Sequence, residues 1–178
     1  MRKARQDRNF ELAHGVTSTY YASNKSILMP EVTKSILIEQ PVEMVYNYLT
    51  ALKNLPERIP SMLKAELISG EEMQVGSQFL VTSKVLGKQT EMIYEITMIE
   101  SNQVYGTKVI SGSQPLYERY QFEEDKKGTK VTVTANGDMP GLIKIFSGSF
   151  KRLLKKQVEN DLERLKDILE ERDRQGKE

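Results

Sequence analysis

The chain has 178 residues, a length within the range of one domain, and its 26 Lys and Arg nearly balance 25 Asp and Glu, leaving a net charge of +1. This balance gives no global electrostatic reason to expect a nucleic acid partner. With no Cys, the chain has no disulfides or thiolate sites, and any catalytic triad or multi-His metal site would have to draw on His14, the only His.

The first 30 residues differ from the rest, because basic residues crowd the start and residues 17–26 are small, polar and without periodicity. We therefore expect a loosely held extension over residues 1–30, one domain over residues 31–173 and a charged tail over residues 174–178. Met29 is an alternative true start. The chain has no apolar signal region and no apolar run near the ~20 residues that span a bilayer, so we expect a soluble, cytoplasmic protein.

The domain is predicted to begin with a strand and two short helices. The β-branched run VTKSILIE, residues 32–39, predicts a strand that ends before Pro41. Apolar residues then recur every three or four positions from Val42 to Leu52, which predicts an amphipathic helix with Pro41 in its first turn. The following segment, residues 55–63, contains two prolines and predicts a shorter second helix.

Six further strands are predicted, separated by Gly-rich or polar turns. Links this short make consecutive strands antiparallel neighbours, because a parallel crossover needs about a dozen residues. The result is a meander. The predicted strands are residues 64–69, 77–85, 89–99, 103–111, 116–124 and 129–136.

The last element is a long helix. Asp138 and Pro140 suit a helix start, and apolar residues follow a helical stripe to about Arg172. A helix of this length, about 45–50 Å at ~1.5 Å per residue, needs a large partner surface, and the meander is the only one available. The fold class predicted is α+β, with a strongly curved antiparallel sheet of about seven strands wrapped around the C-terminal helix.

These residues resemble the START-like, polyketide cyclase-like superfamily with the helix-grip fold, also called SRPBCC. The resemblance rests on SILIEQPVEMVYNYLTALKNLPERIP, VGSQF, YQFEEDKKGTKVTVT, DMPGLIKIF and NDLERLKDIL, and it covers roughly residues 32–170. It implies a hydrophobic cavity under the long helix and a range of functions from lipid carriage to cyclisation. The family's usual tryptophan in NLPERIP is replaced by Arg58 or a neighbour, since the chain has no Trp.

Turns placed at residues 87–88, 100–102 and 112–114 define a strand register with one mostly apolar face, which we expect to be concave. The register turns Tyr105 and Tyr117 outward. The candidate ligand-binding residues on the inner face are Phe79, Val81, Met92, Tyr94, Ile96, Lys108, Glu118 and Tyr120.

Tyr94, Lys108 and Glu118 are predicted to form a polar row across three adjacent strands of this inner face. One interpretation is the polar anchor of a ligand pocket, since such sites are mostly apolar with a few convergent polar groups. The other is a charge pair near the cavity mouth that reaches water. A slip of one residue in register would turn the row outward.

The long helix is predicted to cover the cavity with Ile143, Phe146, Phe150 and Leu154. Its apolar stripe is interrupted by the small residues 147–149, which indicate either space for a ligand or a close helix-sheet contact. A basic cluster lies in the front half of the helix and predicts either transient contact with an anionic membrane surface or a solvated face. The cluster consists of Lys144, Lys151, Arg152, Lys155 and Lys156.

The function expected first is non-catalytic binding or carriage of a hydrophobic small molecule, such as a lipid, a polyketide or an isoprenoid-like compound. The alternative is a cyclase, dehydratase or isomerase in which Glu118 is a general acid or base and Tyr94 or Tyr120 polarises a carbonyl. A protein-interaction module using the C-terminal helix ranks last. No metal or cofactor motif occurs: the chain has no Walker A pattern, no G-x-G-x-x-G after a strand and no H-E-x-x-H.

Overall fold

The computed structural model describes residues 31–70, 72–85, 87–111, 116–137 and 147–175, with only the backbone at 85, 147–150 and 173–175. Seven antiparallel strands form one sheet in the order β1-β7-β6-β5-β4-β3-β2. The elements are β1 (Glu31–Ile38), α2 (Val42–Thr50), η1 (Leu52–Asn54), α3 (Leu55–Arg58), β2 (Met62–Ser69), β3 (Gln78–Val85), β4 (Lys88–Glu100), β5 (Val104–Val109), β6 (Leu116–Asp125), β7 (Gly128–Gly137) and α4 (Ser147–Gln175).

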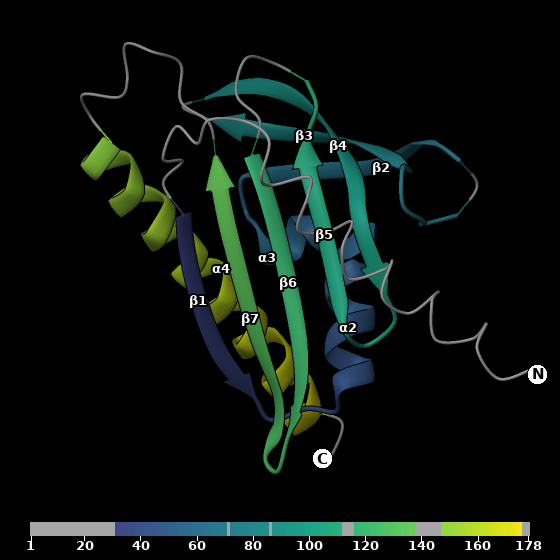
Figure 1. The fold of residues 1–178 in the computed structure, drawn as a ribbon, viewed down its shortest axis with the longest axis vertical. Helices are drawn as coiled ribbons and strands as arrows, with labels where there is room; N and C mark the ends of the chain where they lie inside the picture. The colour runs from purple at the N-terminus through teal and green to yellow at the C-terminus, as the bar shows by residue number, and fades with distance from the viewer. Residues whose placement is uncertain (1–30, 71, 86, 112–115, 138–146, 176–178) are drawn as a thin grey trace, which may run out of the picture.

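The predicted fold class is confirmed. The sheet is strongly curved, so that β2 runs across the direction of the long strands β6 and β7, and the three labelled α-helices lie together on one face (Figure 1). The first strand closes the sheet beside the last, since β1 pairs with β7 from Glu31↔Asn136 to Ile38↔Thr129. The predicted start of the long helix, at Asp138 and Pro140, lies outside the described residues.

The long helix α4 packs along β1 and also contacts β7 and α3. Its buried side chains recur every three or four residues and form the predicted apolar stripe. They are Leu154, Val158, Leu162, Leu165 and Leu169, all at most 7 % exposed. Polar contacts flank the stripe: Lys166 Nζ donates to the Leu37 carbonyl oxygen at 2.9 Å, and Lys34 pairs with Glu159. None of the helices in the described part of the chain is long and apolar enough to cross a bilayer.

One irregularity in β4 determines which residues of β5 face the interior. The β4–β5 register shifts between Ile96 and Met98, so that the sheet contains a β-bulge at Thr97. Gly106 lies opposite this bulge, where a Cβ would come within 2.9 Å of Thr97 Oγ1 and 3.2 Å of Met98 Cβ. The bulge therefore needs a residue without a side chain on the neighbouring strand.

Candidate functional site

A pocket lies between the helical segment α2–α3 and the concave face of the sheet, where strands β2 to β6 supply its floor. Its walls are mainly aliphatic and aromatic, with one guanidinium and one carboxyl group among them. The lining residues are Leu49, Thr50, Leu52, Leu55, Arg58, Ile59, Met62, Phe79, Val81, Tyr94, Tyr105, Thr107, Glu118 and Tyr120.

Two aromatic pairs form the sheet side of the pocket. Phe79 and Tyr94 stack with ring centroids 5.2 Å apart and planes 12° from parallel, and the ring centroids of Tyr105 and Tyr120 are 6.5 Å apart. Burial raises the pKa of all three tyrosines above its ordinary value. Their hydroxyls therefore stay protonated at neutral pH and can donate hydrogen bonds.

Arg58, the last residue of α3, is the buried cation of the pocket and is only 5 % exposed. Its Nη1 donates to the Tyr120 hydroxyl at 3.2 Å, and its Cζ lies 5.6 Å from the centre of the Tyr120 ring. Burial by itself lowers the pKa of Arg58, but nearby Tyr120 and Glu118 outweigh that effect and raise it. The guanidinium is therefore charged in the interior.

Two carboxyl groups surround this cation without closing an ion pair with it among the described side chains. Glu118 extends from β6 into the pocket, and Asp161 approaches from α4. Burial raises the pKa of Glu118, although the Arg58 charge opposes this shift. Burial also raises the pKa of Asp161, to about 6, again against the effect of Arg58. At both positions burial disfavours the charged carboxylate, so the proton is released at a higher pH than from an exposed carboxyl group.

The raised pKa of Asp161 predicts a stability that falls with rising pH. Between about pH 4 and 6, the folded protein holds a proton at Asp161 that the unfolded chain has already released, so the free energy of unfolding decreases over this interval, by at most about 3 kcal/mol. Asp161→Asn removes this ionisation. We expect it to match the unaltered protein near pH 4 and to exceed it by about 1–3 kcal/mol at pH 8, in urea denaturation followed by circular dichroism.

Asp167→Asn, an exposed position on the same helix, is the matched control and should show no such pH-dependent gain. If the Asp161→Asn and Asp167→Asn curves coincided across this range, the burial of the Asp161 carboxyl would be refuted.

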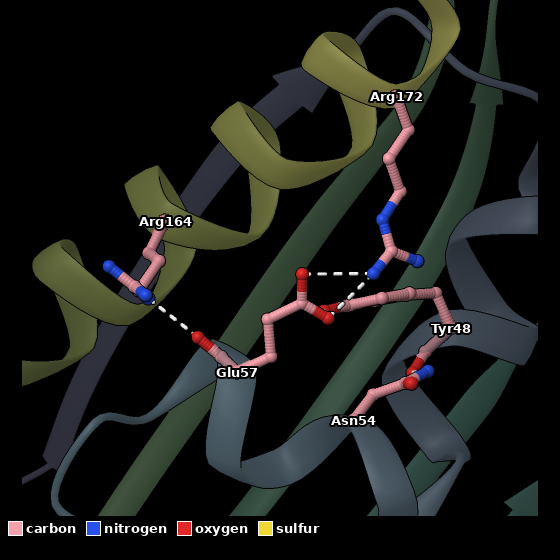
Figure 2. Close-up of polar contacts among 5 residues, drawn as sticks. All are labelled: Tyr48, Asn54, Glu57, Arg164 and Arg172. Atoms are coloured by element: carbon pink, nitrogen blue, oxygen red, sulfur yellow. Dashed lines mark hydrogen bonds and ion pairs between the residues drawn. The ribbon is translucent and has the colours of Figure 1, made fainter. Parts of the chain in front are cut away.

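A second polar cluster ties α3 to the C-terminal half of α4, and we call it the Glu57 clasp (Tyr48, Glu57, Arg164 and Arg172; Figure 2). Arg172 Nη2 donates to both carboxylate oxygens of Glu57, at 2.9 and 2.6 Å, and Arg164 Nε donates to the Glu57 carbonyl oxygen at 2.6 Å. The Tyr48 hydroxyl donates to Glu57 Oε2 at 2.9 Å, and burial together with this bond raises the pKa of Tyr48 to about 12. The clasp holds the segment that carries Arg58.

Glu57→Gln is expected to lower the free energy of unfolding by about 1 kcal/mol, because the charge-assisted bonds to Arg172 are lost but the pair is partly exposed. A double-mutant cycle with Arg172→Met should give a coupling of about 0.5–1 kcal/mol in urea denaturation. Glu66→Gln, whose partner Lys64 is also exposed, should change stability by less than about 0.5 kcal/mol. A coupling near zero would mean that the clasp does not hold α3.

The structure brings five of the predicted site residues together in the pocket wall: Phe79, Val81, Tyr94, Glu118 and Tyr120. Three others lie in or against the core outside this wall. Ile96 and Leu154 are buried, and Met92 packs against the core. Ile143, Phe146 and Lys144 lie outside the described residues, as does the side chain of Phe150.

The prediction that Lys108 faces the pocket is wrong. Thr107 pairs with Glu118, and Lys108 pairs with Glu95, which places Lys108 Nζ 2.6 Å from Glu95 Oε1 on the outer face. The bulge at Thr97 is the physical reason, because a displacement of one residue turns every side chain of a strand to the other face. For the same reason Tyr105, predicted to point outward, lines the pocket.

The polar residues in or near the pocket that the sequence did not predict are Thr50, Arg58, Tyr105, Thr107 and Asp161. For Tyr105 and Thr107, the sequence signal was Gly106 between them, since a glycine inside a strand indicates a bulge or a close approach of the neighbouring backbone. For Arg58 the sequence offers no comparable signal, because the segment between Pro56 and Pro60 carries a second charge at Glu57.

The pocket in the described structure is small. Its cavity volume of about 20 Å³ is enough for one water molecule. The roomy cavity expected from the sequence is not present between these lining residues, because aromatic side chains from four strands fill most of the concave face.

Solved structures with similar folds include a protein from Thermus thermophilus, which is 19% identical, covers 78% of this chain and 95% of its own, and gives a TM-score of 0.64. The di-domain ARO/CYC StfQ from the steffimycin biosynthetic pathway is 16% identical, with 82% of this chain and 52% of that chain covered and a TM-score of 0.68. A START superfamily protein from Mycobacterium smegmatis is 17% identical over 82% of this chain and 97% of that chain, with a TM-score of 0.60.

At these identities the structural likeness shows the fold alone. No curated protein matches the sequence. The sequence model of the family described as "Polyketide cyclase / dehydrase and lipid transport" matches residues 29–170, which span the whole sheet and most of α4. This chain therefore belongs to the polyketide cyclase/dehydrase and lipid transport family.

Proposed function

We propose that the protein binds a hydrophobic small molecule, such as a lipid, a polyketide or an isoprenoid-like compound, in the pocket between α3 and the sheet, without converting it. The observation that supports this most is the composition of the pocket wall. Seven of its lining side chains are aliphatic, Met or Phe, and the charged groups are limited to Arg58 and Glu118. Small-molecule sites have this character, with apolar walls and a few convergent polar groups.

Binding requires the walls to separate, since a cavity of about 20 Å³ is far smaller than any such ligand. The helix α3 has only four residues and carries Leu55 and Arg58 of the pocket wall. Its attachment to α4 is polar and partly exposed, through the Glu57 clasp. We infer that α3 moves outward when the ligand enters.

The direct experiment is native mass spectrometry of the protein purified from its own host, together with a titration by Nile red, a neutral apolar dye. We expect a co-purifying apolar molecule, or dye fluorescence that saturates at one dye per chain. Met62→Trp should weaken dye binding, because Met62 lines the pocket. Leu63→Trp is the matched control, since Leu63 is 50% exposed and is not part of the pocket wall. Absence of both signals would rule out the carrier function.

The second candidate is catalysis by Glu118 as general acid or base, with Tyr94 or Tyr120 donating a hydrogen bond to a carbonyl oxygen. It is favoured by one observation: these three residues line the same pocket, and burial raises the pKa of the Glu118 carboxyl. In a β-hydroxyketone, the Glu118 carboxylate could take the proton from the carbon next to the carbonyl while Tyr94 or Tyr120 donates to the enolate oxygen. The protonated carboxyl could then return this proton to the β-hydroxyl group, which leaves as water as the C=C bond forms. In this case Glu118→Gln should abolish dehydration of a β-hydroxyketone but preserve Nile red binding, and unchanged turnover would exclude the role.

We also propose transient contact with an anionic membrane surface through the basic cluster of α4. Four of its five members, Lys151, Arg152, Lys155 and Lys156, are exposed, and Lys144 lies outside the described residues. Leu153 among them is 65% exposed. Sedimentation with vesicles that contain phosphatidylserine, but not with phosphatidylcholine alone, would support this contact.

A further inference from the structure

The guanidinium of Arg58 has more hydrogen-bond donors than the structure uses. An arginine side chain carries five N–H donors in a rigid fork. In the part of the chain that is described, Arg58 makes one side-chain hydrogen bond, to the Tyr120 hydroxyl at 3.2 Å, although it is only 5 % exposed and lines the pocket. A buried arginine is ordinarily paired with a carboxylate at bonding distance. Here the donors have capacity for an additional partner.

The tyrosine hydroxyls around this end of the pocket are also donors. The hydroxyls of Tyr94 and Tyr105 line the same pocket and stay protonated because burial raises their pKa, and burial also raises the pKa of the Glu118 carboxyl. From α4, Asp161 contributes the remaining titratable group near Arg58. A wall rich in donors is complementary to an acceptor, and a planar group with two oxygens matches the fork of a guanidinium best.

We propose that Arg58 is the specificity-determining residue of this pocket and that it selects apolar molecules that end in a carboxylate. This inference rests on the proposed binding function. The two carboxylate oxygens would accept hydrogen bonds from the guanidinium, and the apolar remainder of the molecule would contact the aliphatic and aromatic wall. Lys108, the cation that the sequence suggested for this role, is engaged with Glu95 on the outer face.

The test compares two ligands of equal apolar length, dodecanoate and dodecanol, by isothermal titration calorimetry of the full chain at pH 7.5. Since the alkyl chain contributes equally to the binding of both ligands, the ratio of their affinities measures how much the carboxylate group adds to binding. We expect dodecanoate to bind about tenfold or more tightly than dodecanol, as charge-assisted hydrogen bonds imply. In Arg58→Met the ratio should fall to within about threefold, with dodecanol affinity little changed.

Two further variants test whether the preference for the carboxylate depends on the guanidinium of Arg58 and not on any nearby positive charge. Lys108→Met removes a cation from the outer face and should leave the ratio unchanged. Arg58→Lys keeps the positive charge but loses the planar guanidinium, so the ratio of the two affinities should fall by about threefold or more. This variant provides the test if Arg58→Met does not fold. Equal affinities of the two ligands for the unaltered protein, or a preference that survives both Arg58 substitutions, would overturn the proposal. Failure of both ligands to bind the unaltered protein would instead overturn the binding function itself.

Discussion

The Leu165→Ala variant is expected to lose about 2–5 kcal/mol of unfolding free energy, because it removes a fully buried side chain where α4 meets the sheet. Leu165 is 0% exposed and lies in the middle of the apolar stripe by which α4 is held against β1. Chemical denaturation followed by far-ultraviolet circular dichroism measures the loss as a shift in midpoint.

Leu153→Ala on the same helix is the matched control for Leu165→Ala. Leu153 is 65% exposed, so the same truncation should change stability by no more than about 0.5 kcal/mol. Equal losses in the two variants would show that α4 is not docked on the sheet by the face that the structure gives.

Gly128→Ala should destabilise the protein by about 3 kcal/mol or more, since both the backbone conformation and the surroundings exclude a side chain. Gly128 has a φ of +141°, and an added Cβ would overlap the carbonyl oxygen of Ile38 and lie 2.8 Å from the Gln40 nitrogen. This glycine therefore lets the β6–β7 hairpin approach the end of β1, where the Thr129 hydroxyl donates to the Gln40 carbonyl oxygen at 2.7 Å.

Gly76→Ala separates the backbone strain at Gly128 from the steric overlap of the added Cβ. Gly76 has a φ of +88°, but no atom lies within 4 Å of its added Cβ, so only the backbone strain of about 1 kcal/mol is expected. Thermal denaturation of both variants gives the comparison. A loss at Gly128 no larger than that at Gly76 would contradict the close approach of the hairpin to β1.

Strand order and most side-chain orientations could be predicted from the sequence because alternation and turn chemistry act locally. Short polar turns made the meander the only reasonable topology, and alternating apolar residues placed Tyr120 correctly on the inner face of β6. In β4, a prediction two residues out of register still gave the right face for Met92, Tyr94 and Ile96, because a shift of two preserves alternation.

The face of β5 could not be predicted from alternation alone. Met92, Tyr94, Ile96 and Met98 alternate without a visible break, so the extra residue at the bulge has no signature on its own strand. The constraint comes from Gly106 on the next strand, through a contact that exists only once the strands are paired. The polar chemistry of the pocket was misassigned as a result, with Lys108 in place of Arg58.

A different reason prevented Arg58 from being predicted as the cation of the pocket. Its position depends on the turn of α3 over the sheet and on Tyr120 and Asp161, which lie far from it in the chain. A local pattern carries no information on such long-range contacts. The volume of the pocket also depends on long-range contacts, since it is what remains after side chains from α2, η1, α3 and five strands have packed.

The most direct measurement of the central claim is a nuclear magnetic resonance titration of the ¹⁵N-labelled protein with dodecanol. Ligand entry between α3 and the sheet predicts saturable shifts, at one ligand per chain, in the amides of Arg58, Thr107 and Glu118, with little change at the exposed Lys64 and Glu123. Shifts confined to the outer face of the sheet, or no saturable shifts at all, would contradict a binding site between α3 and the sheet.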